Sequence, residues 1–210
     1  MSNNNLTVVK PFGPTIVKVS MPEVLINDLN NYVDKIILDE EKAKSLDHGF
    51  KLAGNVKQEF KLENEFLKSS NLLNFLSGGV QKWIELVEKR KISKFNVLSS
   101  WIVRQFENEY NPVHKHGGHI SGVGYLKLPD NFGEPFQASK KGNPNGKLMF
   151  IHGSEMFNCK STFSINPKVG DFYFFPNYLL HTVYPFYKKD DERRSVSFNA
   201  VIDEDIYNVS

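Results

Sequence analysis

The chain is expected to be mainly β, a sandwich or barrel of short strands with an N-terminal helical segment packing on it. Two observations predict this class. From about residue 95, short runs rich in Val, Ile, Phe, Tyr and Ser alternate with clusters of Gly, Pro, Asn and Asp, as strands and turns do. Earlier in the chain, apolar residues repeat at helical spacing. We therefore expect a single domain over residues 1–210, with a mostly helical front at 1–93 and a β core at 94–210.

Two helices are expected in the front part. Pro22 suits a first helical position after Ser20, and apolar residues then recur every three or four positions as far as Ile37. A second helix is expected over about residues 72–91. Its Gly78-Gly79 pair predicts a kink or a break, because glycine is a weak helix former. The segment 56–66 stays ambiguous.

Seven strands are expected after the helical front. Each is a short run of apolar and aromatic residues between turn-forming residues, and none has helical spacing. The expected strands are Val97–Phe106, Ile120–Leu128, Lys147–Ile151, Ser161–Ile165, Asp171–Phe175, Leu180–Val183 and Ser195–Ile202.

Composition excludes several classes of protein. Hydrophobic residues make up 40% of the chain, which suits a folded core, and a net charge of +2 gives no support for a nucleic-acid partner. The single Cys159 excludes an internal disulfide and cysteine-based zinc or iron–sulfur sites. No apolar run approaches about 20 residues, and the polar start has no signal-peptide pattern. We expect no membrane partner and a cytoplasmic location, which is the host cytoplasm if the protein is viral.

Histidines gather in one short stretch. Three of the six fall within six residues, at His114, His116 and His119, and His181 follows a strand-like run and a Phe-Pro turn. Neutral imidazole is a common ligand of transition metals. Because side chains alternate along a strand, His114 and His116 can bind one ion from one side, and His181 can close the site. Three nitrogen ligands leave positions open on an octahedral iron. The alternative is a set of surface histidines near a Gly-Gly loop.

An Arg-x-Ser pattern follows the last of these histidines. Arg193 and Ser195 are two residues apart, so on a strand they share a face, while Arg194 points the other way. A guanidinium with a hydroxyl beside it suits a carboxylate, which accepts two parallel charge-assisted hydrogen bonds. Taken alone, this pattern is also typical of a solvated surface strand.

Together these motifs, in this order, resemble the iron(II)/2-oxoglutarate-dependent oxygenases, and are most similar to the branch common in bacteria and their phages. The resemblance covers roughly residues 101–201 and implies a double-stranded β-helix, the cupin-like jelly roll. The motifs are His114-x-His116, Ser121-Gly122-Val123-Gly124-Tyr125-Leu126, Pro167-x-x-Gly170-Asp171-x-x-x-Phe175-Pro176, His181-x-Val183-x-Pro185 and Arg193-x-Ser195-x-Ser197-Phe198-Asn199.

The resemblance also implies residue roles. His114 and His181 would bind Fe(II), and Arg193, with Ser195 beside it, would anchor the distal carboxylate of 2-oxoglutarate. Tyr125 would be a second donor to that carboxylate, or else an ordinary aromatic of the barrel. The family usually has Asp or Glu where this chain has His116, so the ligand set would be neutral. We favour His116 as the third ligand, and His119 is the alternative.

The activity implied is hydroxylation of an unknown substrate by dioxygen, with decarboxylation of 2-oxoglutarate to succinate. Fold-level analogy suggests a protein or amino-acid side chain as the substrate. A non-catalytic metal-binding jelly roll and an oxygenase that does not use 2-oxoglutarate stay open as alternatives. A homodimer also stays open, with the helical part as its interface or as a support for the sheet. We expect the loop 129–145 to shape the mouth of the site.

Overall fold

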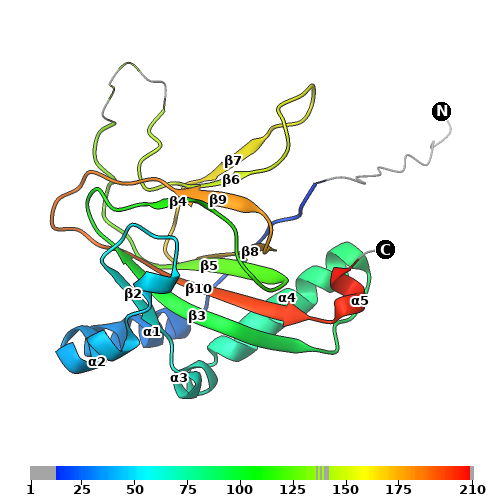
Figure 1. The fold of residues 1–210 in the computed structure, drawn as a ribbon, viewed down its shortest axis with the longest axis horizontal. Coiled ribbons are helices and arrows are strands. Elements are labelled where there is room, and N and C mark those ends of the chain that lie inside the picture. The colour runs from blue at the N-terminus through cyan, green and yellow to red at the C-terminus, as the bar shows by residue number, and fades with distance from the viewer. Residues whose placement is uncertain (1–12, 136, 138, 140–141, 209–210) are drawn as a thin grey trace.

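Two antiparallel sheets face each other, and helices cover the outer face of the larger one (Figure 1). This computed structural model describes residues 13–135, 137, 139 and 142–208, so the polar start of the chain lies outside the described residues. The mainly β class with a helical segment packed on the sheet, predicted from the sequence, is confirmed. None of the described helices has the length and apolar character needed to span a bilayer.

The larger sheet has six strands in the order β1-β8-β5-β10-β3-β2, with every neighbouring pair antiparallel. The six strands are β1 (Val17–Ser20), β8 (Asp171–Pro176), β5 (Ile120–Lys127), β10 (Arg193–Ile202), β3 (Phe95–Gln105) and β2 (Gln58–Lys61).

The smaller sheet has four short strands in the order β4-β9-β6-β7, again antiparallel throughout. In Figure 1 it lies above the larger sheet. Its strands are β4 (Asn111–His114), β9 (Leu180–Val183), β6 (Leu148–Ile151) and β7 (Thr162–Ile165).

The two longest helices pack on the outer face of the larger sheet. Their apolar stripes bury Leu29 and Val33 of α1 and Leu76 and Val80 of α4 against sheet residues such as Phe198. The helices are α1 (Glu23–Ile37), α2 (Glu40–Leu46), α3 (Asn64–Ser69), α4 (Leu72–Glu88) and α5 (Glu204–Tyr207), with a 3₁₀ turn η1 at Gly49–Lys51.

Alternation along the strands gives the larger sheet two different faces. On β10, Val196 and Phe198 point to the helices, while Arg193, Ser195 and Ser197 point to the space between the sheets. The outer face is therefore an apolar core, and the inner face combines a smaller apolar cluster with buried polar groups.

The structure differs from the prediction in several short elements and in the course of one helix. All seven predicted strands are present, but three strands of four residues each were missed: β1, β2 and β4. The ambiguous segment 56–66 contains β2 and the start of α3. Helix α4 runs through Gly78-Gly79 without the expected break. A Cβ at Gly79 would lie 2.5 Å from the Phe174 ring, so this glycine lets the helix approach the sheet closely.

Candidate active site between the two sheets

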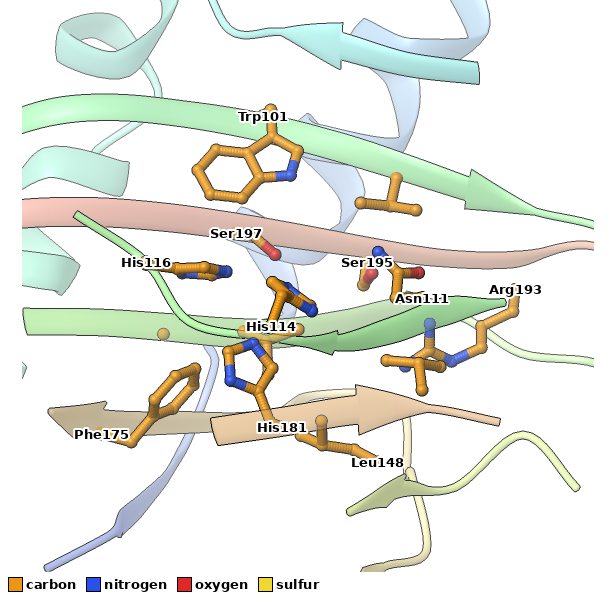
Figure 2. A pocket seen from close by; sticks show the side chains of 14 residues that line it. Trp101, Asn111, His114, His116, Leu148, Phe175, His181, Arg193, Ser195 and Ser197 are labelled. Atoms are coloured by element: carbon orange, nitrogen blue, oxygen red, sulfur yellow. The ribbon is translucent and has the colours of Figure 1, made fainter. Parts of the chain in front are cut away.

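A cavity lies between the sheets, lined by side chains from both (Figure 2). Three imidazoles stand at one end of it, and the guanidinium of Arg193 stands at the other. Ser195, Ser197 and Asn111 lie along the wall between them. Segments that are far apart in the chain, β3, β4, β9 and β10, therefore build one site.

The histidine cluster consists of His114, His116 and His181. Strand β4 pairs with β9 so that His114 lies opposite His181, and His116 follows two residues after His114. The ring centroids are 4.3 Å apart for His114 and His181, 4.8 Å for His116 and His181, and 5.1 Å for His114 and His116. One ring nitrogen from each residue lies within 4.8 Å of the other two, close enough for one metal ion to be held.

Hydrogen bonds fix which nitrogen of each ring faces the cluster. Nδ1–H of His114 donates to the Pro112 carbonyl at 2.7 Å, and Nδ1–H of His181 donates to the Leu179 carbonyl at 2.8 Å. The Ser121 hydroxyl donates to Asn199 at 2.8 Å, so it accepts from Nδ1–H of His116 at 3.1 Å. We therefore assign all three histidines as the tautomer with a free Nε2, the form in which a second hydrogen bond orients a metal ligand.

The three rings are neutral at physiological pH. Burial lowers the pKa of all of them, to about 4 for His116 and about 3 for His181. The cluster lowers these values further, because a charge on His114 would repel a charge on either neighbour. Neutral imidazoles have the free electron pair that coordination needs.

His119, the alternative third ligand, lies elsewhere. Its ring stacks on Tyr207 with 3.9 Å between centroids. Nδ1 accepts a hydrogen bond from the Ile202 backbone N–H at 3.1 Å, and Nε2 lies 3.4 Å from a carboxylate oxygen of Glu204. Both ring nitrogens are therefore engaged outside the histidine cluster.

Arg193 carries an incompletely paired guanidinium into the cavity. The residue is 1% exposed, and burial lowers the pKa of its guanidinium. Nη1 donates to Oε1 of Gln105 at 2.9 Å, but Nε and Nη2 have no hydrogen-bond partner. Leaving such donors unpaired in a buried place is costly, so an acceptor is expected there.

Ser195 and Tyr125 accompany Arg193 on neighbouring strands. They lie directly opposite each other on β10 and β5, so both face the inner side of the sheet. Ser195 lines the cavity. Tyr125 is fully buried and does not line it; its ring centroid lies 5.1 Å from the guanidinium carbon of Arg193. Its hydroxyl has no partner, and burial raises the pKa of Tyr125 to about 12.

Three further residues of the site region were not singled out by the sequence. Asn111 lines the cavity from β4, Gln105 holds Arg193, and Glu59 is a buried carboxyl on β2. Asn111 stands beside the histidine motif, which was a usable signal. Gln105 and Glu59 belong to strands whose pairing brings them there, so no local pattern marks them.

The loop 129–145 does not contribute its described residues to the cavity. Residues 136, 138, 140 and 141 of this loop lie outside the described part of the chain. Its described flanks are joined by Asn145, whose amide donates to the carbonyls of Phe132, Gly133 and Glu134. The expectation that this loop shapes the mouth of the site stays a prediction.

Comparison with protein families gives one match. A family described as "Putative 2OG-Fe(II) oxygenase" matches residues 99–199, the stretch from β3 to β10 that holds all three clustered histidines and Arg193. No curated protein matches the chain in sequence.

Solved structures share the fold at low sequence identity. A viral collagen prolyl hydroxylase from Paramecium bursaria Chlorella virus-1, in complex with 2OG, is 16% identical with a TM-score of 0.58, covering 88% of this chain and 94% of that chain. A prolyl-4-hydroxylase from Pseudomonas putida is 14% identical with a TM-score of 0.53, covering 88% and 91%. HygX from Streptomyces hygroscopicus, with nickel and 2-oxoglutarate bound, is 9% identical with a TM-score of 0.53, covering 87% and 80%.

These neighbours have the jelly-roll fold expected from the resemblance, and the two sheets of this chain form the same double-stranded β-helix. The matching family adds the chemistry, since its description states both Fe(II) and 2OG. Residues 99–199 therefore match the 2OG-Fe(II) oxygenases, a family of oxidoreductases whose cofactors are Fe(II) and 2-oxoglutarate.

Proposed function

We propose that His114, His116 and His181 are the iron ligands of this oxygenase and that the chain hydroxylates an amino-acid side chain. The observation that carries the proposal is the convergence of three neutral imidazoles, each with a free Nε2, in a cavity that also holds an unpaired guanidinium. The donor set fits Fe(II), because three nitrogen ligands leave positions open for a co-substrate and dioxygen. His119 is disfavoured as the third ligand because both of its ring nitrogens are engaged.

Arg193 is proposed to bind the distal carboxylate of 2-oxoglutarate. Its unpartnered Nε and Nη2 are adjacent donors, the pair that a carboxylate accepts in a bidentate contact. Ser195 would donate a further hydrogen bond from the same wall of the cavity. Tyr125 would hold the guanidinium in place through its ring and would turn its unpaired hydroxyl to the same carboxylate.

When bound, Fe(II) and 2-oxoglutarate supply the oxidation: dioxygen gives one oxygen atom to the substrate C–H bond and the other to succinate, with release of carbon dioxide. The chain's own part is positional. Pro112, Leu179 and Ser121 fix the imidazole tautomers, and the apolar walls of Phe175 and Leu148 exclude water.

A neutral ligand set distinguishes this site from the usual one. With His116 in place of a carboxylate, the protein contributes no negative charge to the metal, so the full charge of the ion acts on an anionic co-substrate. We propose that this strengthens the binding of 2-oxoglutarate and changes the redox tuning of the iron. A His116→Asp variant should keep the metal and alter both properties.

An amino-acid side chain is proposed as the target because two of the similar structures are prolyl hydroxylases. The co-substrates are 2-oxoglutarate and dioxygen, as the family requires.

Anaerobic titration tests the proposal. Purified protein loaded with Fe(II) should develop a visible charge-transfer band when 2-oxoglutarate is added. A His181→Ala variant should lose iron and the band, while the matched control His119→Ala should retain both. Iron content that is normal in His181→Ala would refute the ligand assignment. Iron binding without a band would favour an oxygenase that does not use 2-oxoglutarate, and a preference for zinc would favour a non-catalytic module, since three histidines also suit zinc.

A further inference from the structure

A second pocket adjoins the histidine cluster, and Arg193 does not line it. His114, His116, Trp101 and Asn111 line both this pocket and the cavity between the sheets, so the two spaces meet at the proposed metal site. Glu59 also lines this pocket. We call it the Glu59 pocket. A molecule in it would lie directly beside the three imidazoles.

Glu59 is a buried carboxyl without a partner. Strand β2 places it opposite Val103 of β3, and the residue is 1% exposed. Neither Oε1 nor Oε2 has a hydrogen-bond partner. Buried acidic groups are almost always paired, because an unpaired one costs far more than it contributes to the fold. An unpaired carboxyl that lines a pocket can therefore accept hydrogen bonds from a bound ligand.

The segment 51–55 lies beside Glu59, and its first three residues line the pocket. Asn55 forms an antiparallel bridge with Tyr110, just before β4, with backbone hydrogen bonds of 2.8 and 3.4 Å. A Cβ added at Gly54 would lie 2.9 Å from Oε1 of Glu59 and 3.0 Å from Nδ2 of Asn111. The carboxyl oxygen of Glu59 and the amide nitrogen of Asn111 therefore both lie close to Gly54.

The electrostatic surroundings favour a cation. Burial raises the pKa of Glu59 to about 7, and the charges of Asp47 and Glu109 raise it in the same direction. No lysine or arginine within the described residues forms an ion pair with Glu59. Lys51 and Lys115 also line the pocket, but both are exposed at its rim. Within the described chain, the three histidines are the only cluster of three or more potential metal ligands, so Glu59, Asp47 and Glu109 do not form such a cluster.

We propose that the Glu59 pocket binds an ammonium group of the prime substrate, with the Glu59 carboxylate accepting its hydrogen bonds beside the iron site. The inference rests on the proposed function, because it is the proposed iron site that makes this pocket the place of the reacting molecule. An ammonium has three donors and one positive charge, which match two unpaired carboxylate oxygens in a negative field. It can come from the α-amino group of a free amino acid or from a lysine side chain of a peptide, and both sources carry the same recognised group.

Calorimetric titration of the enzyme loaded with Fe(II) and 2-oxoglutarate, without oxygen, tests the inference. The probes are n-butylammonium chloride and its neutral counterpart 1-butanol. Wild-type protein should bind the ammonium at least about tenfold more tightly, since a charge-assisted hydrogen bond contributes that much or more. Glu59→Gln should abolish this preference, and Glu65→Gln, which removes the same charge from an exposed position on α3, should leave it intact. An unchanged preference in Glu59→Gln would overturn the proposal.

Two further measurements separate recognition from a structural role. Gly54→Ala should weaken ammonium binding, because its Cβ crowds the carboxyl without changing any charge. Glu59→Gln should melt no lower than wild type, since it removes an unpaired buried acid. A lower melting temperature would mean that Glu59 supports the fold, and the inference would fail.

Two further sets of titrations identify the source of the ammonium and test whether the pocket binds it independently of the proposed function. L-norleucine offers only an α-ammonium, and a capped Gly-Lys-Gly peptide offers only a side-chain ammonium; the tighter of the two identifies the source. The same titrations on metal-free protein detect the pocket alone. If the ammonium preference persists while no charge-transfer band forms, the proposed function fails and the pocket stands. If the band forms without the preference, the inference fails alone.

Discussion

Arg193 and Arg194 are neighbours in sequence, both buried, and lie on opposite faces of strand β10. All three nitrogens of the Arg194 guanidinium donate, to Glu192 at 2.8 and 3.1 Å, to Asn30 at 3.0 and 3.2 Å, and to Asp34 at 2.8 Å. Arg193 has one partner and two unpaired nitrogens. The first arrangement joins helix α1 to the sheet, and the second leaves donors free in a cavity.

This contrast indicates that the two faces of the sheet have different roles. On the helix-covered face, buried charge is fully satisfied within the chain, so it serves the fold. On the inner face, polar groups are left short of partners that the chain does not provide, so they are available to a ligand. Glu192 and Glu59 repeat the same contrast with acids: the first contacts Arg104, Arg194 and Lys127, and the second contacts no donor.

The largest effect is expected from Arg193→Met. Losing one partner of a buried charge pair costs roughly 3–5 kcal/mol, so the dissociation constant of 2-oxoglutarate should rise by on the order of a hundredfold or more. The free energy of unfolding should not fall, because an unpaired buried cation is replaced by an apolar chain. The charge-transfer titration and urea unfolding measure the two quantities. An unchanged affinity for 2-oxoglutarate would contradict the proposal that Arg193, unlike Arg194, binds a ligand.

Arg194→Met should show the reverse pattern. The free energy of unfolding should drop by roughly 3–5 kcal/mol, because Glu192 loses a buried partner and α1 loses its attachment through Asp34. The affinity of the folded fraction for 2-oxoglutarate should match that of wild type. A loss below about 1 kcal/mol in urea unfolding would mean that this network contributes little.

The two buried glutamates should give stability opposite slopes with pH. Burial would raise the pKa of Glu192, but the guanidinium groups of Arg104 and Arg194 outweigh it and lower the pKa to about 2. Its contribution is therefore present above its ordinary pKa and is lost as the pH falls toward 2. The pKa of Glu59 is raised to about 7, so stability should fall as the pH rises toward 7.

Each pKa shift corresponds to a total change of on the order of 3 kcal/mol in the free energy of unfolding. The free energy of unfolding should be measured between pH 2 and 8. In Glu192→Gln it should no longer fall as the pH drops toward 2, and in Glu59→Gln it should no longer fall as the pH rises toward 7. Identical profiles in the two variants would contradict the opposite assignments.

A smaller effect is expected where α4 meets the sheet. Gly79→Ala brings a Cβ to 2.5 Å from the Phe174 ring, so overpacking should destabilise the protein by about 1–3 kcal/mol. Gly78→Ala is the matched control, since nothing lies within 4 Å of its new Cβ, and it should stabilise the helix by up to about 1 kcal/mol. Thermal melting of both variants checks the pair. Equal effects would mean that Gly79 has no packing role.

What could be predicted from the sequence was local. Periods of two and 3.6 residues are properties of single segments, so they gave seven strands, two helices and the opposite orientations of Arg193 and Arg194. Strands β1, β2 and β4 were missed: β4 contains Pro112, and all three pair with strands far along the chain, so no neighbouring segment marks them.

The rest of the site required tertiary structure. The sequence favoured His116 as the third ligand but left His119 open, because the contacts that engage His119 are to residues 202–207, about 80 positions later. Glu59 lies in a polar four-residue strand with no pattern of its own, and its burial comes from the segment that covers it. A buried polar group without a partner, such as Glu59, is recognised only from its tertiary surroundings, so no periodic pattern in the sequence marks it.

The Nδ1 contacts of the three clustered histidines have a consequence for metal exchange. Each ring is held by a hydrogen bond at Nδ1, in two cases to a main-chain carbonyl, so a ring that turns away loses that bond. The apoprotein therefore keeps a preorganised chelate, and little conformational entropy is lost when an ion arrives. Iron should load rapidly into protein that is already folded, with no dependence on the metal for refolding.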